Sequence, residues 1–146
     1  MVFLALGSNA GDRDTNLAVA RARLARRFDV TLACSQVLNT TAIGFEGADF
    51  LNQVVAFESP MSPTEVLDIC QEIEIEMGRK VHIPRYNAAG DRIYEDRIID
   101  IDILKDNGIM ISSPRLVLPH PQCKSRAYVE QLISTFDEKI QKAYYE

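Results

Sequence analysis

Several features that would classify a protein at once are missing from this chain of 146 residues. No apolar run reaches the roughly 20 residues that a membrane span needs, and the short apolar start of the chain lacks the basic segment of a signal peptide. Three widely spaced cysteines form no CxxC pair, so we expect reduced thiols in the cytoplasm and no zinc site. Neither GxxxxGK[ST] nor GxGxxG occurs, which excludes a P-loop or a Rossmann nucleotide site.

An excess of positive charge is absent as well. The chain has 16 Lys and Arg residues against 21 Asp and Glu, for a net charge of −5, which argues against nucleic acid or an anionic membrane as a partner. Two segments are locally basic: residues 79–97 hold five basic and three acidic residues, and residues 112–126 hold three basic residues and no acid. This segregation favours an anionic ligand bound between them, with solvated loop faces as the alternative.

The periodicity of apolar residues predicts one α+β domain over residues 1–146. We expect this domain to be a monomer. Strands are expected at residues 2–6, 30–38, 50–57 and 98–104, with a short additional strand at 109–111. One helix begins near Asp12 or Asp14 and ends near Phe28. The order β-α-β-β-α-β predicts a ferredoxin-like α/β sandwich with a mainly antiparallel sheet and an extra C-terminal helix.

The second helix carries the clearest boundary signals. Ser62 and Glu65 form a capping box, Pro63 suits the first helical position, and Gly78 suits the position after the last turn. The extra C-terminal helix is expected to follow Pro121 and to end near residue 136.

The sharpest chemical signal is the sequence RIIDIDIL at residues 97–104. Side chains of a strand alternate between faces, so three isoleucines would face the core while Asp100 and Asp102 stand on the other face, about 6.6 Å apart along the strand. Two carboxylates this close repel unless a cation lies between them, and Mg²⁺ is typically held by one or two carboxylates with phosphate oxygens. The alternative is an edge strand with a polar outer face.

Arginines and one histidine accompany this carboxylate pair. Guanidinium groups match phosphate oxygens in geometry and keep their charge, so the arginines of residues 79–97 are candidate phosphate ligands together with the carboxylates, as in phosphoryl transfer. His120 lies between two prolines and between Arg115 and Arg126, where it could bind a phosphate or a ribose. A structural surface histidine is the alternative.

A third candidate site lies on the strand at residues 50–57. Phe50 and Asn52 would share one face of that strand. An aromatic ring that stacks and an amide that reads a polar edge suit a flat heterocyclic ligand. The alternative is that Phe50 belongs to the core.

Taken in order along the chain, these motifs resemble those of the hydroxymethyldihydropterin pyrophosphokinase family. They are GSN at residues 7–9, FLN at 50–52, MGR at 77–79, DRIIDIDIL at 96–104 and LPH at 118–120. The resemblance covers nearly the whole chain. It implies an enzyme of folate biosynthesis that transfers pyrophosphate from ATP to 6-hydroxymethyl-7,8-dihydropterin with two Mg²⁺ ions and releases AMP.

The same resemblance implies a role for each matching residue. The metal ligands would be Asp100 and Asp102. The ATP-binding residues would be Gln71, Glu74, Arg97, Arg115, His120 and Arg126. The pterin-binding residues would be Thr40, Thr41, Ile43, Phe50, Asn52, Asp100 and Tyr128, and the catalytic residues Arg79, Arg85, Arg97 and Asp102.

The chain departs from the family in one region. Many members carry a Trp-Gly-Pro-Arg run before the aspartate strand, whereas this chain has no tryptophan and carries GDRIYEDR at residues 90–97. We expect residues 79–96 to form a lid over the phosphates, with Arg92 sharing the role of the missing run. The rival functions are another Mg²⁺-dependent phosphotransferase, or a non-catalytic ligand-binding module on the same fold.

Overall fold

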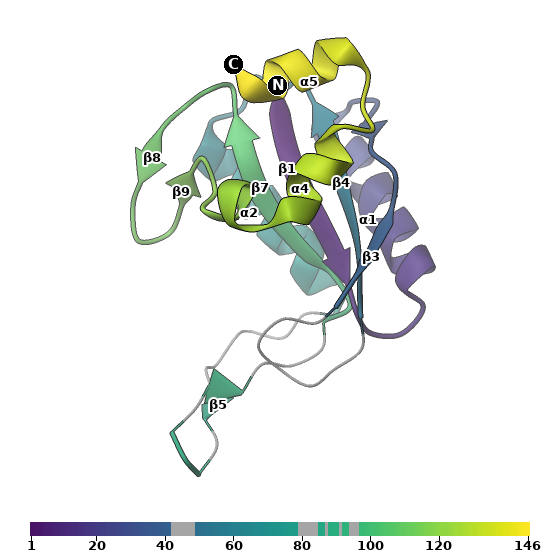
Figure 1. Ribbon diagram of the computed structural model, residues 1–146, viewed down its shortest axis with the longest axis vertical. Helices are drawn as coiled ribbons and strands as arrows, with labels where there is room; N and C mark the ends of the chain where they lie inside the picture. The colour runs from purple at the N-terminus through teal and green to yellow at the C-terminus, as the bar shows by residue number, and fades with distance from the viewer. Residues whose placement is uncertain (42–48, 79–84, 87, 91, 94–96) are drawn as a thin grey trace.

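The computed structural model describes residues 1–41, 49–78, 85–86, 88–90, 92–93 and 97–146, with only the backbone at 85–86, 92–93 and 122. The described chain forms one five-stranded sheet between two layers of helices, and the two termini lie close together at one end (Figure 1). Two small hairpins stand outside the sheet, one formed by β5 (Arg85–Tyr86) and β6 (Arg92–Ile93), the other by β8 (Ile111–Ser112) and β9 (Val117–Leu118).

The sheet is antiparallel and has its N-terminal strand at the centre. Strand β1 (Val2–Ser8) pairs with β4 (Phe50–Phe57) on one side and with β7 (Asp100–Asp106) on the other. The far side of β4 pairs with β2 (Ala33–Cys34) and β3 (Leu38–Thr40). This arrangement confirms the predicted α+β fold with its antiparallel sheet.

The single strand predicted at residues 30–38 is wrong, because two short strands replace it. Ser35 lies buried between them and forms two hydrogen bonds with Val54 of the neighbouring strand. Its backbone N–H donates to the Val54 carbonyl, and its Oγ accepts from the Val54 N–H, both at 2.9 Å. A side chain that replaces a backbone partner interrupts the ladder at that point, so β2 ends before it and β3 begins after it.

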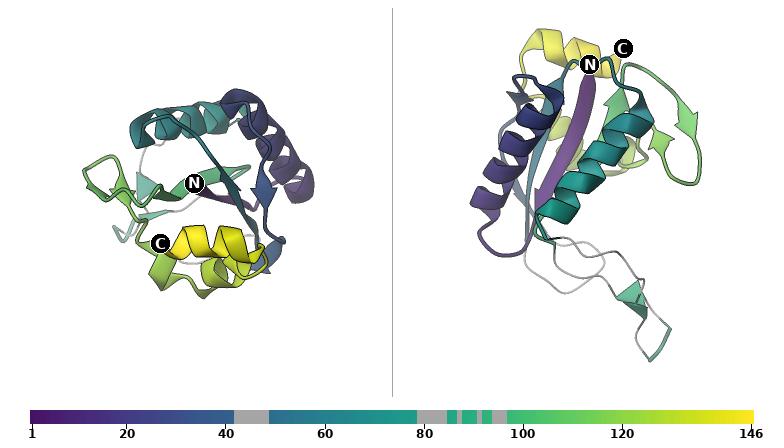
Figure 2. Two further views of the ribbon diagram at one scale, coloured as in Figure 1. Left: turned by 90° about the horizontal axis from the view of Figure 1, so that it is seen from above. Right: turned by 180° about the vertical axis from the view of Figure 1, so that it is seen from behind.

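One face of the sheet is covered by α1 (Arg13–Phe28) and α2 (Pro63–Glu76), as Figure 2 shows from two sides. Both helices begin where the sequence predicts, with Asp12 capping α1 and the capping box of Ser62 and Glu65 present on α2. Gly78 follows α2 with φ +107°, a conformation that favours glycine. The larger apolar core lies between these helices and the sheet.

The opposite face is covered by three helices, α3 (Gln122–Ser125), α4 (Ala127–Ile133) and α5 (Glu138–Tyr145). The sequence predicts one helix that ends near Phe136, so its division and the continuation into α5 are corrections. A second apolar core joins Phe3, Leu104 and Tyr144 beneath these helices. Among the described residues, no helix has the length and hydropathy needed to cross a membrane.

Candidate active site

Strand β7 separates apolar from charged side chains residue by residue. Ile99, Ile101 and Ile103 are at most 3% exposed and belong to the core beneath α1 and α2. Asp100 and Asp102 lie between them in sequence, are partly exposed, and line a pocket of about 530 Å³. The alternation predicted from RIIDIDIL is therefore present, and the isoleucines fix the face on which the two carboxylates stand.

The pocket is walled by three parts of the chain: helix α2, strand β7 and the residues 114–121 that include β9. It brings together seven of the side chains that the sequence marks as site residues, namely Gln71, Glu74, Arg97, Asp100, Asp102, Arg115 and His120. These residues come from segments that are distant in sequence, and the fold makes them neighbours.

Arg97 is held in place by a residue that the sequence marks only as part of a turn. The buried Asn9 donates its backbone N–H to the Arg97 carbonyl at 3.0 Å, and its Oδ1 accepts from the Arg97 N–H at 2.6 Å. The guanidinium of Arg97 then lies 3.4 Å from Asp100 Oδ1. Asn9 thus links the end of β1 to the start of the aspartate strand, and no periodic pattern signals such a role.

Glu74 of α2 binds the backbone of β7. Its side chain is only 4% exposed, and Oε2 accepts from the backbone N–H of Ile101 at 2.9 Å. A buried carboxylate needs such hydrogen bonds. The bond joins α2 to the strand between the two aspartates, a structural role that the sequence does not indicate.

Gly7 lies on the same face of the sheet as Asp100. It pairs with Asn52 on one side and with Asp100 on the other, so the three residues form one row across the strands. A Cβ at Gly7 would lie 3.3 Å from Asn52 Oδ1 and 3.4 Å from Phe50 Cδ1. The absence of a side chain at Gly7 lets the Phe50 ring and the Asn52 amide lie close against β1.

The predicted pterin-binding residues of β3 and β4 lie beside Gly7. Thr40 faces Phe50 across the strand pair, and its Oγ1 accepts from Asn52 Nδ2 at 2.6 Å. Asn52 is buried, Phe50 is partly exposed, and Thr41 is exposed. The bond to Thr40 fixes the orientation of the Asn52 amide. Ile43 lies outside the described residues.

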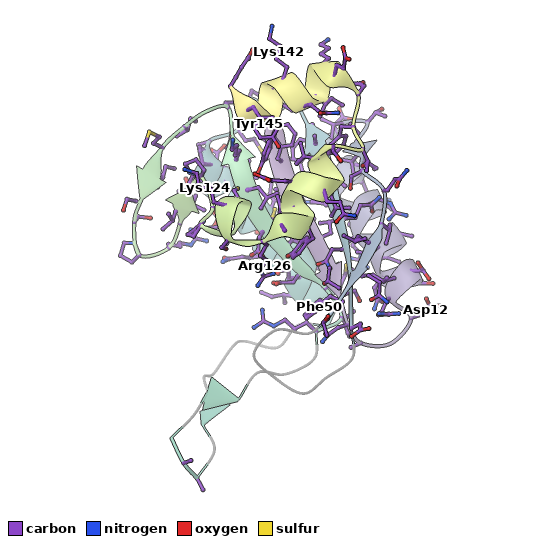
Figure 3. The ribbon with its side chains drawn as sticks, viewed as in Figure 1. Asp12, Phe50, Lys124, Arg126, Lys142 and Tyr145 are labelled. Carbon is purple, nitrogen blue, oxygen red and sulfur yellow. The ribbon has the colours of Figure 1, made fainter. Side chains whose placement is uncertain are left out.

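Arg126 and Tyr128 approach from the helical layer over this face. Arg126 Nη1 donates to Tyr128 Oη at 2.7 Å, and the guanidinium carbon lies 5.7 Å from the centre of the Tyr128 ring. Figure 3 shows Arg126 and Phe50 toward the same end of the sheet. Neither Arg126 nor Tyr128 is among the described residues that line the pocket.

His120 lies at the pocket wall in the same region. Its backbone N–H donates to the carbonyl of Leu104 at 2.9 Å. Partial burial lowers the pKa of the imidazole below its usual 6.5, and the charge of Arg126 lowers it further, while Asp100 opposes the shift. The imidazole is therefore neutral at pH 7, with one N–H donor and one acceptor nitrogen.

The donor set of the pocket fits a hard cation. The described residues contain no group of three or more His, Cys, Asp and Glu residues arranged to enclose a metal. A pair of carboxylates on an open wall suits a cation that takes its remaining ligands from phosphate and water. Asp100 and Asp102 form such a pair, and Arg97 and Arg115 line the same pocket.

Two predicted catalytic residues fall where no side chain is described. Arg79 lies outside the described residues, and Arg85 is described only as backbone in β5. The predicted lid at residues 79–96 likewise falls mostly outside the described part of the chain.

A pair of carboxylates with arginines around it is the arrangement by which phosphoryl-transfer enzymes bind a metal-bound polyphosphate. Comparison with known proteins narrows this class. The family model described as 7,8-dihydro-6-hydroxymethylpterin-pyrophosphokinase matches residues 3–138. The chain belongs to this family, which confirms the resemblance seen in the motifs.

Relatives with established names agree. A 2-amino-4-hydroxy-6-hydroxymethyldihydropteridine pyrophosphokinase of Porphyromonas gingivalis is 40% identical over 136 residues, which cover 92% of this chain and 88% of that protein. The protein of the same name from Bacillus subtilis is 33% identical over 144 residues, covering 97% and 81%. A folate synthesis bifunctional protein of Chlamydia trachomatis is 30% identical over 142 residues, covering 92% of this chain and 30% of its own length.

Family membership fixes the reaction class. The family name and the names of these relatives indicate pyrophosphoryl transfer from ATP to hydroxymethyldihydropterin in folate biosynthesis, so the chain is an enzyme of the transferase class. Kinase chemistry with ATP implies a divalent metal, in agreement with the carboxylate pair of β7.

Proposed function

We propose that this reaction takes place in the pocket between α2, β7 and residues 114–121. The hydroxymethyl oxygen of the dihydropterin attacks the β-phosphorus of ATP, the bond from that phosphorus to the α,β-bridging oxygen breaks, and AMP leaves. The observation that carries this proposal is the pair Asp100 and Asp102, which line the pocket along β7 beside Arg97.

We assign the metal as Mg²⁺ and its protein ligands as Asp100 and Asp102, with two ions bound alongside ATP. Bound Mg²⁺ neutralises phosphate charge and aligns the phosphate chain. The strand that presents the two carboxylates is anchored by the buried side chains of Ile99, Ile101 and Ile103.

The cationic wall of the pocket would hold the phosphates. Arg97 and Arg115 line the pocket, and His120 offers a neutral N–H donor. Arg126 would add a further positive charge from the helical layer. Arg79 and Arg85 stay predictions from the family resemblance. Gln71 at the rim suits the nucleoside, whereas Glu74 acts on the site by holding β7.

The row of Asn52, Gly7 and Asp100 would lie beside the pterin ring. Phe50 and Tyr128 supply aromatic surfaces for stacking. Asn52 and Asp100 lie on either side of Gly7 and suit the donors and acceptors on the polar edge of the ring. Thr40, Thr41 and Ile43 belong to the segment that would complete this subsite.

The proton of the attacking hydroxyl needs no dedicated base. Asp102 is the candidate acceptor of that proton, and positioning with charge neutralisation accounts for most of the catalysis in phosphoryl transfer. We further expect a cytoplasmic monomer that binds no nucleic acid. Size-exclusion chromatography with light scattering measures the mass against the 16.4 kDa of one chain.

The test is AMP release from ATP by the purified protein, with and without 6-hydroxymethyl-7,8-dihydropterin, and with Mg²⁺ or EDTA. We expect AMP and pterin pyrophosphate in equal amounts only when both pterin and Mg²⁺ are present. Formation of ADP, or AMP release that does not depend on the pterin, contradicts the proposal.

A further inference from the structure

Arg115 forms its side-chain hydrogen bonds across the pocket rather than into it. It lies in the turn between β8 and β9, on one wall, and its Nη2 donates to Asp68 Oδ1 and, at 3.0 Å, to Gln71 Oε1 on α2, the opposite wall. Asp68 and Gln71 are three residues apart on the helix, so both face the same side. One guanidinium nitrogen therefore ties the two walls together.

We propose that Asp68 is the counter-ion that Arg115 exchanges for the phosphates of ATP, and that Asp68 thereby sets the affinity of this pocket for polyphosphates. The inference rests on ATP binding in this pocket, as proposed above. Asp68 is not a lining residue of the pocket, whereas Arg115 and Gln71 are. Its carboxylate thus acts on the nucleotide through Arg115, as a positioning residue.

The charges determine the direction of the effect. ATP brings up to four negative charges into a pocket whose rim already carries Asp68, so the carboxylate both competes for Arg115 and repels the ligand. Asp68 and Arg115 are 52% and 50% exposed, and an exposed ion pair contributes at most about 1 kcal/mol. The exchange is therefore easily reversible, and its size corresponds to about a fivefold change in affinity or less.

Asp68→Asn tests the proposal, because it removes the charge and keeps the shape. Glu72→Gln is the matched control: it removes one charge from the same helix, but Glu72 pairs with Arg27 of α1. We expect Asp68→Asn to lower both the dissociation constant of a non-hydrolysable ATP analogue with Mg²⁺ and the KM for ATP about two- to fivefold. The effect should shrink at high salt, kcat should change less than KM, and Asp68→Glu should restore the wild-type value.

A double-mutant cycle shows whether the effect passes through Arg115. In an Arg115→Ala background, Asp68→Asn should change the affinity no more than Glu72→Gln does. An unchanged or weakened affinity in Asp68→Asn, or an equal gain from Glu72→Gln, overturns the inference. Wild-type protein that fails to bind the analogue overturns the proposed function instead, so the two failures are distinguishable. Thermal unfolding of each variant verifies that it is folded.

Discussion

The two faces of the sheet are built for different purposes. The face beneath α1 and α2 is apolar along its length, and its core includes Leu4 of β1 and Ile103 of β7. The other face is apolar only where α4 and α5 cover it, and toward its opposite end it carries Asn52, Gly7 and Asp100 in one row. Polar side chains contribute less to stability on burial than apolar ones do. The fully packed face therefore provides stability that leaves part of the other face available for ligands.

The strongest way to break this comparison is to remove a charge from the ligand face. Asp100→Ala or Asp102→Ala should lower the rate of AMP formation on the order of a hundredfold or more, since a metal ligand is lost. The unfolding temperature should change little, because relief of the mutual repulsion of the carboxylates opposes the loss of the Arg97–Asp100 ion pair. Mg²⁺-dependent AMP formation and thermal unfolding measure the two effects.

The matching change on the packed face is Leu24→Ala in α1. Leu24 is fully buried, so its truncation should cost about 2 to 5 kcal/mol of unfolding free energy, with kcat per folded molecule unchanged. If either aspartate variant behaves like Leu24→Ala, the carboxylates are structural. If either retains normal activity, the metal assignment is wrong.

The second prediction separates the two ligands. Phe50→Ala and Asn52→Ala should each weaken pterin binding about 10- to 100-fold, because stacking area or a hydrogen bond to the ring edge is lost. Binding of the ATP analogue should change much less. Calorimetric titration of each variant with each ligand gives both values, and equal losses for pterin and nucleotide would place Phe50 in the core instead.

A smaller effect is expected at Arg13, which the sequence does not mark. Arg13 Nη1 donates to the carbonyl of Asp49 at 2.7 Å, directly before Phe50. Arg13→Ala should raise the KM for the pterin about two- to fivefold, with the KM for ATP unchanged. Arg23→Ala is the control on the same helix, since Arg23 pairs with Glu76. A parallel change in both KM values excludes a specific role for Arg13.

The smallest effect concerns pH. Because the pKa of His120 is lowered in the folded state, protonation favours the unfolded chain. The wild type should match His120→Gln in the pH dependence of its unfolding temperature above about pH 7.5. It should lose stability relative to that variant as the pH falls below 6.5 toward 5. Unfolding curves that stay parallel across this range would show that His120 is not shielded as described.

The sequence predicts what local periodicity determines. The alternation on β7, the capping box of Ser62 and Glu65, and the start of α1 at Asp12 are all present, because each depends on residues close together in the chain. The motifs shared with the family indicated which residues make up the site. Its residue roles stay predictions until the variants above are measured.

What the sequence could not predict depends on contacts between distant residues. Ser35 divides a strand because it binds Val54, and Asn9 matters because it binds Arg97. Helix α5 is stabilised by Lys105, whose Nζ donates to the Tyr144 carbonyl at 2.6 Å and lies 4.1 Å from the centre of the Tyr144 ring. Such pairings leave no periodic pattern in the sequence, so only the three-dimensional structure reveals them.

The central position of β1 has a consequence for how the protein folds. During synthesis, β1 can complete its pairing only after β4 and then β7 have followed, and the partner of Asn9 lies 88 positions further along the chain. Contacts of such long range slow folding, because loop closure precedes any gain from the contact. A nascent chain that ends before Asp106 has neither a finished sheet nor both halves of the pocket. Folding and the acquisition of activity should therefore occur together, late in synthesis, and a refolding assay should recover nucleotide binding in the same kinetic phase as the sheet.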